Sequence, residues 1–178
     1  MLKTREESRE VLYVDEPLPL VSRHDIAVLE ARVEEAPFKR TRLCVHHDPQ
    51  DRLHEMFIVQ SPRTYIRPHK HMDKAESLLV LDGAADAIFF DEAGAITSVV
   101  SLGDYGSGQP FFYRIGEALY HSLLIRTETF VFKEATHGPF DRTRTVFAPW
   151  APDERDQAGA DAYKLALIKQ VRSVWVPS

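Results

Sequence analysis

Short stretches of alternating apolar and polar residues follow one another along the middle of the chain. Successive side chains of an extended strand point to opposite faces, so this alternation predicts β-strands. Turn residues separate most of them, as at residues 91–94 (DEAG), which predict a hairpin loop. This spacing predicts a barrel or sandwich rather than alternating strands and helices. The predicted strands include MFIVQ (56–60), RTYIRPH (63–69), SLLVLDG (77–83), AADAIFF (84–90), AITSVV (95–100), FFYRI (111–115), ALYHSLLI (118–125) and TFVFKEA (129–135).

A helical pattern lies near each end of the chain. Ser22 and Asp25 have the spacing of a capping box, and Pro37 ends the helix that they begin. Apolar residues then share one face of this helix: Ile26, Leu29 and Val33. Residues 151–170 predict a polar loop that enters a second helix, with apolar side chains at Tyr163, Leu167 and Val171.

These patterns divide the chain into three parts within one domain, as expected for 178 residues. Residues 1–39 form an N-terminal extension with a strand (VLYV, 11–14) and a helix, and residues 40–140 form the barrel. Residues 141–178 form a tail that packs on the barrel or on a second subunit, because it carries the large apolar residues Trp150, Trp175 and Val176.

Composition narrows the classes of protein. The net charge of −5 argues weakly against a nucleic-acid partner. Cys44 is the single cysteine, so no disulfide within the chain is possible. We find neither the apolar core of a signal peptide nor a run of about 20 apolar residues, the length that spans a membrane. We therefore expect a cytoplasmic protein without a membrane partner.

Candidate metal ligands lie in PHKHMDKAESLLVLDG (68–83). Alternate side chains of a strand share one face about 6.6 Å apart, so His69 and His71 point the same way. Glu76 can return on the neighbouring strand after a tight turn. Two imidazoles and a carboxylate suit one divalent zinc, iron, manganese or nickel ion. His121 is the candidate fourth ligand, because a histidine within an apolar run needs a polar partner.

Chance is the alternative origin of such a histidine pair, since the chain has eight histidines. The added spacing to Glu76 and Gly83 favours the metal site. With it, the stretch resembles the first motif of the cupin superfamily, in which glycine, HxH, glutamate and glycine recur at fixed intervals. Arg63 stands where the leading glycine belongs. The second motif retains His121, while Gly116, Ala118 and Ile125 replace its proline, glycine and asparagine.

From about residue 40 to residue 140 the chain resembles WbuC-type cupin-fold metalloproteins. The resemblance rests on RTRLCVHHDPQDRLHEMFI (40–58), TYIRPHKHMDKAESLLVLDG (64–83), IFFDEAGAI (88–96) and EATHGPF (134–140). It implies an all-β, single-domain cupin barrel of the RmlC-like jelly-roll type with one bound metal ion. It also implies an association with bacterial surface-polysaccharide biosynthesis, but no reaction.

Other side chains are candidates for binding a small-molecule substrate. Arg67 shares the face of His69, so it either orients an anionic substrate or pairs with a carboxylate of the barrel. Arg42 and His46 alternate with Cys44 on a strand whose inward face forms a substrate-facing wall. Cys44 has no basic partner in the sequence and is interpreted as a packed thiol. Tyr113 and His46 are candidate general bases.

Three functions are compatible with these residues. The first is a metal-dependent isomerase, epimerase or dioxygenase acting on a small anionic or sugar-derived molecule. The second is a ligand sensor without turnover, and the third is a barrel that the metal only stabilises. We expect a homodimer, with residues 11–14 or the tail at the interface.

Overall fold

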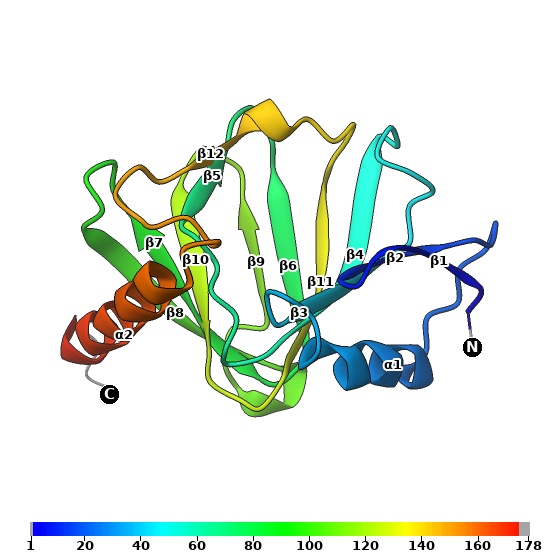
Figure 1. The fold of residues 1–178 in the computed structure, drawn as a ribbon, viewed down its shortest axis with the longest axis horizontal. Coiled ribbons are helices and arrows are strands. Elements are labelled where there is room, and N and C mark those ends of the chain that lie inside the picture. The colour runs from blue at the N-terminus through cyan, green and yellow to red at the C-terminus, as the bar shows by residue number, and fades with distance from the viewer. Residues whose placement is uncertain (1, 175–178) are drawn as a thin grey trace.

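Two β-sheets face each other and form the body of the protein, whose computed structural model describes residues 2–174 (Figure 1). The seven-stranded sheet has the order β1-β2-β3-β4-β11-β6-β9. Its strands are β1 (Thr4–Ser8), β2 (Val11–Val14), β3 (Arg40–Cys44), β4 (Leu53–Gln60), β11 (Phe130–His137), β6 (Glu76–Asp82) and β9 (Phe112–Ile115). Neighbouring strands are antiparallel, except that β2 and β3 are parallel.

The five-stranded sheet has the order β12-β5-β10-β7-β8, and all its pairs are antiparallel. Its strands are β12 (Thr145–Phe147), β5 (His69–His71), β10 (Tyr120–Ile125), β7 (Ala84–Phe90) and β8 (Ile96–Gly103). Short 3₁₀ helices lie at Tyr105–Ser107 and Arg142–Arg144. This architecture confirms the predicted all-β barrel with a helix toward each end.

The space between the sheets is closed at one end by an apolar core. Alternating residues of β6 and β11 meet small and branched residues of β7 and β10 there. The buried side chains include Leu78, Val80, Phe130 and Phe132 from one sheet and Ala85, Ala87 and Leu123 from the other. His121 alternates with Leu123 on β10, so it faces the same interior.

The outer faces are covered by the two helices (Figure 1). Helix α1 (Arg23–Val33) packs Leu29 and Val33 on the outward residues Leu43 and Val59 of the larger sheet. The predicted capping pair is confirmed, because the Ser22 backbone N–H donates to Oδ2 of Asp25 over 2.9 Å. Asp25 also accepts from the backbone N–H of Leu2, which holds the N-terminal segment against the helix.

Helix α2 (Gln157–Val174) packs on the outer face of the smaller sheet (Figure 1). Its residues Leu167 and Val171 join Ile88 and Phe90 in a second buried cluster. The Trp150 ring lies 5.1 Å from that of Phe90, so the tail covers its own barrel in this region. Trp175 and Val176, which the sequence also assigned to packing, lie outside the described residues.

The strand expected at residues 63–69 is wrong, because β5 begins only at His69. Pro62 and Pro68 bracket this segment and lack the backbone N–H that a strand ladder needs. The Thr64 N–H instead closes a turn onto the carbonyl of Ser61. β1 was not predicted, because its sequence (TREES) is polar throughout and its side chains are all exposed. No helix within residues 2–174 is long and apolar enough to cross a membrane.

Candidate metal centre

Three imidazoles converge between the sheets at one end of the barrel. His69 and His71 come from β5, and His121 lies opposite His69 in the β5–β10 register. One ring nitrogen from each residue lies within 4.8 Å of the other two. The spacing of residues on β5 therefore brings His69 and His71 together. The pairing of β5 with β10 adds His121, which lies 50 positions beyond His71 in the sequence.

Hydrogen bonds at Nδ1 fix how these rings are turned. Nδ1 of His69 lies 2.9 Å from the carbonyl oxygen of Arg67, and Nδ1 of His121 lies 2.9 Å from that of Leu119. A carbonyl only accepts, so Nδ1 of each of these two rings carries a proton, and Nε2 is the nitrogen left to bind a metal ion. Nδ1 of His71 lies 3.3 Å from the hydroxyl of Thr145 on β12. Such outer contacts typically orient metal-binding histidines.

Glu76 places a carboxylate at the same point. It is the first residue of β6 and returns toward β5 after a turn in which Asp73 has a φ of 52°. Its oxygens lie 3.0 Å from Nε2 of His71 and 3.5 Å from Nε2 of His121. Two ligands about 2.1 Å from one ion lie roughly 3.0–3.4 Å apart at right or tetrahedral angles, so the distances of Glu76 from His71 and His121 fit a shared ion. Glu76 lies outside the group of three histidines whose ligand atoms are all within 4.8 Å of one another.

The protonation states of His69 and Glu76 suit metal binding, whereas the hydrogen bond and charge of Glu76 outweigh burial and raise the pKa of His121. Burial, followed by the nearby charge of His121, lowers the pKa of His69 to about 3, so this imidazole is neutral at pH 7. Burial alone would raise the pKa of Glu76, but hydrogen bonds with His121 and His71 outweigh it and hold that pKa below its usual range. A neutral imidazole and an ionised carboxylate are the forms that coordinate a cation.

A cavity of about 440 Å³ adjoins the four side chains. All four predicted substrate-binding residues line it: Arg67, Arg42, His46 and Tyr113. Arg42, Cys44 and His46 face the cavity, while Leu43 packs against α1 on the other side of the sheet. These three side chains therefore lie on the inward face of the strand, as the alternation predicts. Cys44 is buried, and burial raises the pKa of its thiol, which suits a packed role.

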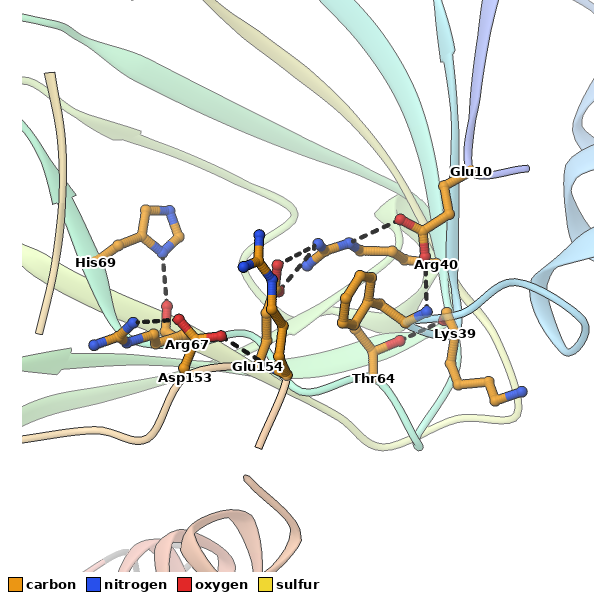
Figure 2. Close-up of polar contacts among 10 residues, drawn as sticks. Glu10, Lys39, Arg40, Thr64, Arg67, His69, Asp153 and Glu154 are labelled. Carbon is orange, nitrogen blue, oxygen red and sulfur yellow. Dashed lines mark hydrogen bonds and ion pairs between the residues drawn. The ribbon is translucent and has the colours of Figure 1, made fainter. Parts of the chain in front are cut away.

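The contacts of Arg67 indicate that it pairs with groups of the protein rather than orienting a substrate. Its guanidinium donates to Oδ2 of Asp153 over 3.1 Å (Figure 2). It also donates to the carbonyl of Ala148 over 3.1 Å. It also lies over the ring of Phe147. The same residue fixes His69 through its own carbonyl, as the dashed line in Figure 2 shows. Arg67 therefore ties the C-terminal segment to a metal-ligand strand.

The two candidate general bases differ in protonation state. Burial, then the charges of Glu76 and Glu134, raise the pKa of Tyr113 well above its usual value, so its hydroxyl keeps its proton. Burial also lowers the pKa of His46, whose ring stacks on that of His54 at 4.1 Å. Tyr113 is therefore a hydrogen-bond donor here, and His46 remains a neutral imidazole.

Lys74 and Glu134 are two of the charged residues that line the cavity without having been predicted as site residues. Lys74 lies in the turn between β5 and β6. Glu134 was only part of a predicted strand. The alternation in TFVFKEA places it on the inward face with Phe130 and Phe132, which was the available signal. Burial, then the charge of Glu76, raises the pKa of Glu134 to about 8.

Comparisons with known proteins assign no activity to this chain. Residues 21–102 match the model of a family described as a domain of unknown function (DUF6016). No curated protein matches. Among solved structures, a mutant of Bacillus subtilis oxalate decarboxylase is 22% identical over 61% of this chain and 27% of that one, with a TM-score of 0.45. The match thus spans about a quarter of the length of that enzyme.

Two further structures are similar in fold. Protein SO0799 from Shewanella oneidensis is 12% identical over 70% of this chain and 78% of that one, with a TM-score of 0.48. Procruciferin, an 11S globulin of Brassica napus, is 16% identical over 49% and 21%, with a TM-score of 0.39. The three histidines could hold a divalent metal ion on the chain's own geometry, while membership of the WbuC type stays a prediction.

Proposed function

We propose that this chain is a metal-dependent enzyme that binds one divalent transition metal ion and acts on a small anionic molecule. The observation that carries the proposal is the convergence of three oriented imidazoles beside an accessible cavity. His69, His71, His121 and Glu76 would hold the ion. A bound divalent ion would polarise a carbonyl or hydroxyl oxygen of the substrate.

The charges of the cavity support an anionic substrate. Within residues 2–174, the side chains of Arg42 and Lys74 line the cavity without an ion pair or hydrogen bond to the chain. The other cavity arginines are engaged, since Arg40 pairs with Glu154 and Arg67 pairs with Asp153 (Figure 2). Unpaired cations beside a metal ion favour a ligand that carries negative charge.

The resemblance to WbuC-type cupins supports a narrower proposal for the substrate. It places the substrate among sugar-derived acids or related intermediates of bacterial surface-polysaccharide metabolism, in the cytoplasm. The cavity also argues against a metal that only stabilises the barrel, because structural sites are typically closed. A ligand sensor would use the same residues without converting the ligand.

The test is a binding and turnover screen of metal-loaded, tag-free protein. Sugar phosphates, nucleotide sugars and small carboxylates would be scored by thermal shift, with His69→Ala as the matched control. Each compound that binds would then be incubated with the protein in air and analysed by mass spectrometry. We expect at least one anion to bind the wild type alone and to be converted. Recovery of every bound compound unchanged would support the sensor, and no metal-dependent binding would contradict both functions.

A further inference from the structure

Glu134 occupies an unusual place on the inner face of the seven-stranded sheet. The strand registers align one row of inward residues across five strands: Cys44, Met56, Glu134, Leu78 and Tyr113. Met56 and Leu78, its direct neighbours, are buried and apolar. Glu134 is half-buried between them, and the partial loss of hydration costs free energy because neither neighbour offers its carboxyl a hydrogen bond.

The carboxyl of Glu134 also lacks a direct partner elsewhere among the described residues. Within residues 2–174 no hydrogen bond or ion pair engages its carboxyl, although the nearby charges of Arg42 and Lys74 act on it. By contrast, Glu154 and Glu10, which also line the cavity, both contact Arg40 (Figure 2). A polar group that packing does not require and that faces a cavity is a candidate for contact with a ligand.

The register also brings Glu134 close to the metal centre. The next inward residue of β11 is Thr136, and its partner on β6 is the metal-ligand candidate Glu76. Glu134 and Glu76 are thus diagonal neighbours on one face of the sheet. The Cα atoms of such neighbours lie roughly 7–8 Å apart. A ligand bound to the ion can reach Glu134 from this distance.

We propose that the cavity takes a small hydroxycarboxylate, whose carboxylate faces Arg42 and Lys74 and whose hydroxyl group hydrogen-bonds Glu134 beside the metal ion. This inference rests on the proposed function and names the class of ligand. A hydroxyl both donates and accepts, so it pairs with a carboxyl in either protonation state. If the ligand carried a second carboxylate in place of the hydroxyl, an ionised Glu134 would repel it. If it carried an ammonium group there, that group would lie beside the metal ion and the cations of Arg42 and Lys74.

The test uses zinc-loaded, tag-free protein and two probes, malate and succinate, which differ by one hydroxyl group. Calorimetric titration of both probes gives a preference ratio. We expect the wild type to bind malate at least roughly tenfold more tightly, the low end for a hydrogen bond to a charged group. Glu134→Gln should keep most of this ratio, because an amide also donates and accepts. Glu134→Leu should lower it by about tenfold.

Two controls separate this role from a structural one. Glu134→Leu should fold with an unchanged or higher Tm, because leucine suits a row that contains Met56 and Leu78. Glu154→Gln, a change at a carboxylate already engaged by Arg40, should leave the malate-to-succinate ratio unchanged.

The outcomes also separate this inference from the proposed function. Wild-type protein that holds no zinc contradicts the metal-dependent function itself. Protein that holds zinc but binds neither probe, or binds both equally, overturns only the hydroxycarboxylate inference. The same conclusion follows if Glu134→Leu keeps the full preference for malate, or if it unfolds while Glu134→Gln binds both probes equally.

Discussion

Arg42 and Arg67 both line the cavity, yet their guanidinium groups have different surroundings. Arg67 is held by Asp153, Ala148 and Phe147, whereas Arg42 has no such contact within residues 2–174. The alternation of residues predicted that both face the interior. It could not predict the contact of Arg67, because Asp153 lies 86 positions further along the chain.

Replacing Arg42 should therefore affect ligand binding, whereas replacing Arg67 should affect stability. Arg42→Ala should leave metal content and Tm unchanged but weaken binding of a small carboxylate by roughly 10- to 150-fold, the loss of about 1.5–3 kcal/mol. Arg67→Ala should lower the free energy of unfolding by about 1–3 kcal/mol, because it leaves the carbonyl oxygen of the buried Ala148 without this donor and removes the ion pair with Asp153. Calorimetry and urea unfolding measure the two effects. An Arg67→Ala protein of wild-type stability with weakened ligand binding would restore the substrate-orienting role.

At the scale of elements, the sequence predicts the features of a single strand better than it predicts which strands pair and in which register. The HxH spacing and the position of Glu76 follow from the strand geometry of one short segment, and the structure brings them together with His121. The role of Glu134 depends on which strands flank β11, and this pairing involves β4 and β6, which lie far away in sequence. Single-strand alternation contains no information about such neighbours.

The start of α1 gives a pH-dependent prediction. Hydrogen bonds from Ser22 and Leu2 lower the pKa of Asp25 from 3.8 to about 2. A lowered pKa stabilises the fold above the unfolded pKa, and this contribution is lost as pH falls from about 4 toward 2. Asp25→Asn should reduce stability by about 1 kcal/mol at pH 6. The difference from wild type should shrink by pH 3 in urea unfolding.

Glu35→Gln, at an exposed position just beyond the same helix, is the control and should change stability little at either pH. An Asp25→Asn effect that is equal at pH 6 and pH 3 would argue against an ionised carboxylate at the helix start.

The docking of α2 gives a second prediction for an element. Leu167 is 3% exposed and packs on the smaller sheet, whereas Leu165 is 60% exposed. Leu167→Ala should lower the free energy of unfolding by about 2–5 kcal/mol, the usual cost of a cavity in a core, while Leu165→Ala should cost less than about 0.5 kcal/mol. Equal effects in denaturant unfolding would mean that the helix is not part of the cooperative core.

At the scale of the whole molecule, we propose that the protein forms a homodimer through the edges of its sheets. β2 is paired on both sides, so residues 11–14 offer no free edge. β1 is the terminal strand of its sheet, and β9, with the exposed Phe112, is the other. Light scattering should give the mass of two chains at roughly tens of micromolar. The mass of one chain there would contradict the dimer.

A metal ion held jointly by β5, β6 and β10 is the central claim, because every functional inference depends on it. The most direct measurement is elemental analysis of protein purified without a tag, a metal-affinity step or added metal. We predict about one transition-metal ion per chain. We also predict that His69→Ala and His121→Ala lose metal and Tm together, since a bound ion stabilises only the folded state. Metal far below one ion per chain in the wild type, with neither variant different from it, would contradict the account.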